Sequence, residues 1–154
     1  MKPFSFTLQR LLDFKERLLE KEKLTLASLR VEQRKLQDQI DYLRGQKAAL
    51  QAKIRKKSSE GAFASDLHSL QYQVDICSFK LKSIREEKKK VDILVEQQLQ
   101  TVLAIIKENA QLEKLKEKQL EEYRLAESRE TEEIISEFVS VKLIKESGRS
   151  GILQ

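Results

Sequence analysis

The 154-residue sequence has little of what builds a compact globular core. It contains no tryptophan, only 6% aromatic residues, four glycines and one proline. Large side chains that fill a thick core are therefore scarce, and so are the residues that break helices and form turns. Charge is abundant instead, since 36% of the residues are Asp, Glu, Lys or Arg. This composition is typical of long helices that pack along a narrow seam.

Cysteine and long apolar runs are also lacking. Cys77 is the single cysteine, so no internal disulfide can form, and we expect a reducing compartment. No stretch approaches the ~18 consecutive apolar residues of a membrane span. Gln9, Arg10 and Asp13 interrupt any signal-like segment at the start. We therefore expect a cytoplasmic protein with no direct membrane insertion, which meets the membrane surface only through partners.

Residues for catalysis or metal binding are sparse. His68 is the only histidine and has no cysteine close enough to share a metal, so we expect packing or surface exposure there. Cys77 falls on an apolar stripe, where a small buried side chain is the expected role. Adjacent carboxylates at 86–87 and 121–122 are typical of a solvated helix, and no glycine-rich phosphate loop is present. We expect no enzymatic activity, no cofactor and no metal.

The net charge of +5 is small, but its distribution is uneven. Residues 4–56 carry 13 Lys/Arg and 7 Asp/Glu, whereas residues 121–137 carry 7 Glu and 2 Arg. Oppositely charged parts indicate different surfaces for different partners. Basic runs occur at 53–57 (KIRKK) and 85–90 (REEKKK), yet they lack interleaved aromatic residues for base stacking. We therefore expect no nucleic-acid partner.

Apolar residues recur at alternating steps of four and three over the first third of the chain. Ten of the fourteen positions are apolar, and a 3.5-residue average kept up this long indicates a left-handed coiled coil. This spacing predicts a first helix over about 5–56, with Ser5 or Thr7 as its N-terminal cap. The seam positions are Leu8, Leu12, Lys15, Leu19, Glu22, Leu26, Leu29, Gln33, Leu36, Ile40, Leu43, Lys47, Leu50 and Ile54.

A turn is predicted over 57–65, where the sequence KKSSEGAFAS (56–65) contains Gly61 to reverse the chain. Ser65 is the expected cap of a second helix over about 66–145, followed by a flexible tail over 146–154. The second seam contains Leu67, Leu70, Val74, Cys77, Leu81, Ile84, Lys88, Val91, Val95, Gln98, Val102, Ile105, Asn109 and Leu112.

The two seams match around the turn. If Ile54 faces Leu67, facing residues have numbers that add to about 121, and Leu8 lies opposite Leu112. The sequence therefore predicts an all-α fold, an antiparallel coiled-coil hairpin that forms a single domain over 1–154 and is a monomer when free. The second helix is longer and extends past the first by about 30 residues.

That extension includes an acidic and apolar segment, residues 121–144, which we call the overhang. Its apolar residues have no first-helix seam left to pack on, so they are candidates for a partner surface. Two alternatives stay open: the N-terminal phenylalanines fold back onto them, or the segment frays. The candidate residues are Ile134, Ile135, Phe138, Val139 and Val141, continued by Leu143 and Ile144.

The opening FSFTLQRLLDFKER, residues 4–17, resembles the FliJ family of flagellar type III export proteins, which commonly begin F-x-F-x-L before a Leu pair and a charged helix. The IDY at 40–42, the short turn at 57–64 and the closing TEEIISEFV at 131–139 lie where the family places related segments. The likeness covers nearly the whole chain and is mainly architectural.

This resemblance implies a non-enzymatic stalk or escort component of the flagellar export machine, needed for flagellum assembly, motility and chemotaxis. It implies that the helical termini bind a hexameric export ATPase, and that the chain also contacts the membrane-embedded export gate and export chaperones. Tyr42 and Tyr72 lie where the resemblance places the gate-binding surface. The implied location is cytoplasmic, on the inner face of the cell membrane through these partners.

Other functions fit a helical hairpin and stay open at this point. A prefoldin-like holding chaperone also has paired helices, but β-hairpins separate them, and the linker at 56–65 is short for that. A structural coiled-coil tether would assemble in trans as a dimer. A stalk of the related virulence-type secretion systems would share the same architecture.

Overall fold

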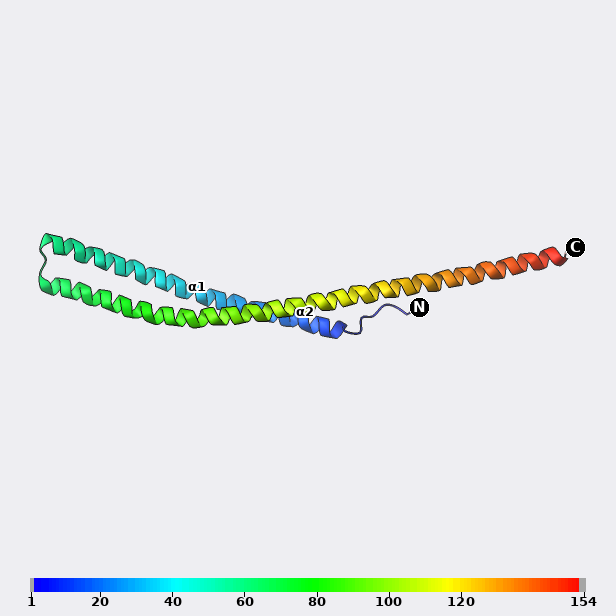
Figure 1. Ribbon diagram of the computed structural model, residues 1–154, viewed down its shortest axis with the longest axis horizontal. Coiled ribbons are helices and arrows are strands. Elements are labelled where there is room, and N and C mark those ends of the chain that lie inside the picture. Colours follow the sequence, from blue (N-terminus) through cyan, green and yellow to red (C-terminus); the bar gives the residue numbers. More distant parts are fainter. Residues whose placement is uncertain (1, 153–154) are drawn as a thin grey trace. The chain divides into compact units, whose positions relative to one another are not determined.

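The computed structural model describes residues 2–152, and the side chains of residues 2–148. The chain forms two long helices that pack against each other, α1 (Gln9–Glu60) and α2 (Ala64–Ile152), so the predicted all-α helical hairpin is confirmed (Figure 1). By its backbone contacts the chain divides into two units. Unit 1 comprises Met1–Glu16 with Ile106–Gln154, and unit 2 comprises Arg17–Ile105.

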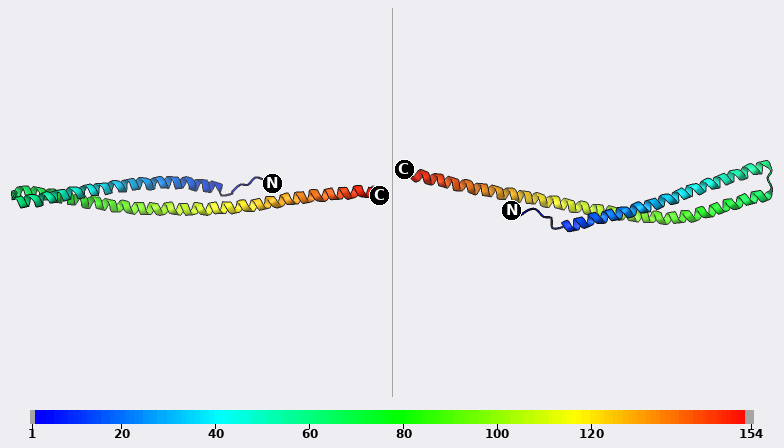
Figure 2. Two further views of the ribbon diagram at one scale, coloured as in Figure 1. Left: turned by 90° about the horizontal axis from the view of Figure 1, so that it is seen from above. Right: turned by 180° about the vertical axis from the view of Figure 1, so that it is seen from behind.

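Unit 2 is an antiparallel pair of helical arms joined by a tight turn, and Figures 1 and 2 show the arms running alongside each other. The two arms bury residues of the predicted seam between them. Ile40, Leu43 and Leu81 form a closed cluster, with Ile84 packed against it. The rest of this core lies on the same 4–3 spacing, because only that spacing keeps one face of each helix toward the other. Its other buried residues are Leu26, Leu36, Val74, Cys77, Val91, Val102 and Ile105.

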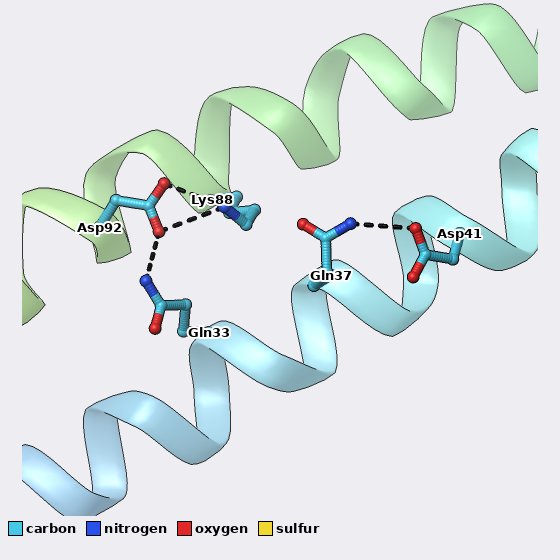
Figure 3. A network of polar contacts seen from close by, with 5 residues as sticks. All are labelled: Gln33, Gln37, Asp41, Lys88 and Asp92. Carbon is cyan, nitrogen blue, oxygen red and sulfur yellow. Dashed lines mark hydrogen bonds and ion pairs between the residues drawn. The ribbon is translucent and has the colours of Figure 1, made fainter.

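Polar pairs fix the register where the unit 2 seam is not apolar. Gln33 on α1 donates a hydrogen bond to Asp92 on α2 at 2.7 Å, and Lys88 forms an ion pair with Asp92 at 3.1 Å (Figure 3). The hydrogen bond from Gln33, with smaller contributions from Lys88, lowers the pKa of the Asp92 carboxyl. Gln98 donates to both the backbone carbonyl and the carboxylate of Glu22. Such directional pairs penalise a shifted register, because a slip leaves polar groups without partners.

Unit 1 places the start of the chain along α2. Leu12 is 1% exposed and Phe6 is also buried, while Lys15 pairs with Glu108 at 2.6 Å. The N-terminal segment, residues 2–8, continues along α2 without helical structure. Phe4 packs on Tyr123 with 5.6 Å between ring centroids, and the Tyr123 hydroxyl donates to the backbone carbonyl of Lys2.

The chain reverses at Gly61, as predicted, but both helices extend closer to this glycine than predicted. Gly61 has a φ of 81°, and the Ala62 N–H donates to the Lys57 carbonyl at 3.0 Å. This is the hydrogen-bond pattern with which a left-handed glycine ends a helix. It lets α1 run to Glu60 instead of 56 and leaves a turn of only 61–63. Because α2 begins at Ala64, Ser65 lies inside its first turn and is not the cap.

Both outer ends also differ from the prediction. The first helix begins at Gln9 and not near residue 5, because a turn at 7–8 comes first, with the Gln9 N–H donating to the carbonyl of buried Phe6 at 3.1 Å. The second helix does not end at 145 with a flexible tail, since α2 continues to Ile152. A single helical glycine, Gly148, costs only about 1 kcal/mol relative to alanine and does not stop it. Residues 153–154 of the predicted tail lie outside the described residues.

Within the described residues, neither helix contains a stretch apolar and long enough to cross a lipid bilayer.

Candidate partner-binding surfaces

The overhang exposes its apolar side chains to solvent. Ile134 is 59% exposed and Phe138 71%, and Ile135, Val139, Val141, Leu143 and Ile144 are exposed as well. The N-terminal segment does not account for them: Phe4 lies on Tyr123, at the very start of the overhang, and Phe6 is buried next to α1. Phe14 is itself 55% exposed. The structure therefore leaves this apolar surface uncovered.

The exposed apolar face is not a continuation of the seam. The seam spacing of four and three residues continues from Leu112 to Tyr123. Its next positions are Ala126, Glu130, Glu133, Glu137 and Ser140, none of which is a large apolar residue. The apolar residues follow one or two positions later, which turns their face by about 100° or more around the helix axis.

This change of phase has a structural consequence. A longer first helix, or an N-terminal segment that followed the seam further, would lie against glutamates and leave the apolar residues uncovered. Ile134, Phe138 and Val141 follow at i, i+4 and i+7 and so form one stripe, with Ile135 and Val139 beside it. The face is therefore available to another molecule without displacing any of the described residues of unit 1.

Carboxylates surround that face. Glu132, Glu133 and Glu137 are exposed. After Arg129, the next cations along α2 are Lys142 and Lys145, beyond most of the apolar residues. A partner for this surface thus combines an apolar groove with a positively charged rim.

The two tyrosines of the second candidate surface lie on unit 2, on different helices. Tyr42 and Tyr72 are 65% and 64% exposed. Gln46 donates a hydrogen bond to the Tyr42 hydroxyl at 2.7 Å, and Gln46 also lines a shallow groove between the helices. Tyr72 lies one helical turn before Ile76, which lines the α2 side of that groove. The complete lining is Gln46, Ala49, Leu50, Lys53, Gln73, Ile76 and Cys77.

Sequence reasoning missed three exposed apolar residues in this part of unit 2. Ile76 is 37% exposed, Phe79 is 74% exposed, and Phe63 in the turn is 80% exposed. Their exposure could have been predicted, because Ile76 and Phe79 fall between seam positions and Phe63 falls in the predicted turn. The groove itself is shallow and open, which suits contact with a protein better than enclosure of a small molecule.

The described residues that the sequence offered for catalysis or metal binding do not gather at one site. Cys77 is buried in the seam, as its position predicted, and His68 is exposed on the first turns of α2. The carboxylates at 86–87 and 121–122 are exposed. Over the described part of the chain, no three His, Cys, Asp or Glu side chains come together as they would to hold a metal ion.

Comparison with known proteins gives no relative for this chain: no family model, no curated protein and no solved structure shows a significant match.

Proposed function

We propose that this protein is a non-enzymatic stalk or escort component of the flagellar type III export apparatus, and that its overhang binds the hexameric export ATPase. The observation that carries the proposal is the apolar face of the overhang, which is exposed and out of phase with the seam. A soluble chain rarely keeps a contiguous apolar stripe in water unless a partner covers it. The resemblance of residues 4–17 and 131–139 to the FliJ family supplies the identity of that partner.

The form of the overhang supports a ring-shaped partner. Beyond Tyr123, none of the described residues of the N-terminal segment covers the exposed apolar side chains of α2, so the overhang presents its apolar stripe on a helix about 10–12 Å across. Residues 124–152 add up to roughly 44 Å of helix at 1.5 Å per residue. A lone helix of this width can be enclosed by a ring of subunits, with its apolar stripe against some of them and its carboxylates facing basic residues of others.

A second surface accounts for the proposed contact with the export gate. Tyr42, Tyr72 and the groove between them belong to unit 2, whereas the overhang belongs to unit 1. Separate surfaces allow two partners to be bound by different residues, so the gate and the ATPase need not compete for one site. In this proposal the protein is cytoplasmic and lies at the inner face of the cell membrane through these partners.

The turn argues against a prefoldin-like chaperone. Only residues 61–63 separate the two helices, and none of the described residues forms a strand. A three-residue connection has no room for the β-hairpins through which such chaperones oligomerise. A virulence-type secretion stalk would use the same two surfaces, and genes for flagellar basal-body components beside this one would favour the flagellar system.

The proposal can be tested by measuring the ATP hydrolysis rate of the export ATPase with and without this chain. We expect the purified chain to hydrolyse no ATP and to change the hydrolysis rate of the hexameric export ATPase when the two are mixed. The chain with Ile134→Ala and Phe138→Ala should leave the ATPase rate unchanged. As a matched control, the chain with Tyr42→Ala should still affect the ATPase but should bind the gate less tightly. An equal effect on the ATPase from wild type and the double variant would contradict the proposal.

A further inference from the structure

Positive charge is concentrated in the part of unit 2 around its turn. Residues 42–85 carry nine Lys/Arg and three Asp/Glu, a net charge of +6, which exceeds the +5 of the whole chain. Of these nine cations only Lys47 is half-buried, and the other eight are exposed. In the described part of the chain, the ion pairs join Lys15 to Glu108, Lys23 to Glu20 and Lys88 to Asp92, so none of the nine is neutralised by one.

Four of these cations lie on the outward side of α1 near its end. Successive residues of a helix are turned by about 100°, so Lys53, Arg55, Lys56 and Lys57 point in directions of about 0°, 200°, 300° and 40° around the axis. All four are exposed. They therefore spread over about 200° of the helix circumference, on the side away from the seam residue Ile54, and form a partial collar wider than a stripe. The collar lies roughly 5–10 Å behind Glu60, the last residue of α1, at 1.5 Å per residue.

An aromatic side chain projects at the apex. Among the large hydrophobic residues whose side chains the structure describes, Phe63 is the most exposed, at 80%, and it lies in the three-residue turn between Ala62 and Ala64. No polar side chain adjoins it in the sequence. Figure 1 shows this turn as the point where both arms of unit 2 end. The turn end, residues 53–68, therefore combines an apolar tip with a basic collar one to two helical turns behind it.

We propose that the turn end docks end-on against an anionic lipid surface, with Phe63 at the boundary between headgroups and acyl chains and the collar at the level of the lipid phosphates. Aromatic side chains favour that boundary, and cations near an anionic bilayer are attracted by its surface potential. The cations lie roughly 5–10 Å behind the end of α1, a distance comparable with the 5–10 Å to which interfacial apolar groups enter a bilayer. One side chain at this depth makes a peripheral contact and no membrane insertion of the chain.

A collar favours a flat surface over a nucleic acid. A polynucleotide is followed by a continuous basic groove with several aromatic platforms, whereas these cations spread over about 200° of the helix circumference and only one aromatic ring stands at the apex. A planar bilayer approached end-on comes within reach of all four cations, which lie within about 6 Å of one another in depth. Glu60 and Asp66 are also exposed at the turn end and oppose the attraction, so the contact is weak and reversible.

This inference does not depend on the proposed function, and it is tested on the full-length chain by co-sedimentation with vesicles. Vesicles containing phosphatidylglycerol should sediment the protein, and vesicles of phosphatidylcholine alone should not. Binding should fall as ionic strength rises, because the collar is solvent-exposed and screened. Lys56→Glu with Lys57→Glu should lower the partition coefficient at least tenfold, since each cation near an anionic surface contributes roughly fivefold. Phe63→Ser should lower it by roughly tenfold through the lost apolar contact.

The overhang with the residue that follows it provides a matched control, because this segment also has an exposed phenylalanine and two exposed lysines. Phe138→Ser and Lys142→Glu with Lys145→Glu should leave vesicle binding unchanged. Circular dichroism should show all variants equally helical, since every altered side chain is exposed. The inference is overturned if anionic vesicles do not bind, if the overhang variants reduce binding as much as the turn-end variants, or if the turn-end variants lose binding to a DNA duplex while vesicles never bind.

Discussion

Replacing Ile134 and Phe138 together by alanine should separate binding from folding. These side chains are 59% and 71% exposed, so most of their apolar surface already lies in water. Full burial of such a side chain is worth about 1.5–3 kcal/mol, which leaves about 1 kcal/mol or less for the contacts that each still makes. Alanine offsets part of this through its higher helix propensity, by about 0.5 kcal/mol per site. We expect the free energy of unfolding to fall by about 1 kcal/mol or less.

Binding to the export ATPase should change far more. Two apolar anchors at the centre of an interface together contribute about 3–4 kcal/mol, which corresponds to a 100- to 1000-fold weaker complex. A binding titration of the purified ATPase with each variant measures this difference, and thermal melts followed by circular dichroism measure the folding term on the same samples.

Leu36→Ala is the matched control, because it removes an apolar side chain that is 8% exposed in the unit 2 seam. A buried Leu→Ala change costs about 2–5 kcal/mol. For a chain of this size the melting temperature should fall by roughly 5–15 °C. Binding to the ATPase below the transition should be retained. If the double variant bound normally and melted many degrees lower, the overhang face would be packed core, and the partner surface would have to lie elsewhere.

Three further outcomes are expected. Gly61→Ala should lower stability by about 1 kcal/mol because φ is 81°, whereas Gly45→Ala, where an added Cβ meets nothing within 4 Å, should raise it by about 0.5–1 kcal/mol in the same melts. Because the folded-state pKa of Asp92 is lowered, its contribution is fully present above the unfolded pKa near 3.8 and is lost as pH falls through the folded value. Asp92→Asn should therefore flatten the stability profile in that acidic range, and an unchanged slope would show that the contact with Gln33 contributes nothing. The free chain should be a monomer in light scattering at micromolar concentration, since the seams pair in cis, and a stable dimer would indicate pairing between chains.

The helices and the seam could be predicted because both follow from local spacing. Of the 28 seam positions identified in the sequence, only Leu8 is exposed, and the other 27 are buried or half-buried. The register was also predictable, since two cross-helix pairs, Glu22 with Gln98 and Lys15 with Glu108, have residue numbers that add to 120 and 123 against an expected 121. A heptad pattern fixes which face is buried, and a short turn fixes which residues meet.

Helix ends were predicted less well, because they depend on competing local terms of about 1 kcal/mol each. Ser65 is a good cap by residue type, yet the hydrogen bonds around Gly61 make the turn so short that Ser65 lies inside α2. Gly148 is a helix breaker by residue type, yet alone it does not end α2. These outcomes depend on how neighbouring preferences balance, which single-residue propensities do not decide.

The sequence by itself thus determined the two helices, their pairing and the presence of unpaired apolar residues in the overhang. Which of these apolar and polar side chains are packed against another segment, and which stay exposed, depends on the tertiary structure. Phe4 rests on Tyr123 and leaves Phe138 exposed, and Gln33 reaches Asp92 across the seam. These contacts join residues 59 or more positions apart, so no local pattern encodes them. They exist only because packing of the seam holds distant segments side by side at one register, which then determines which polar groups are paired and which apolar faces stay in water.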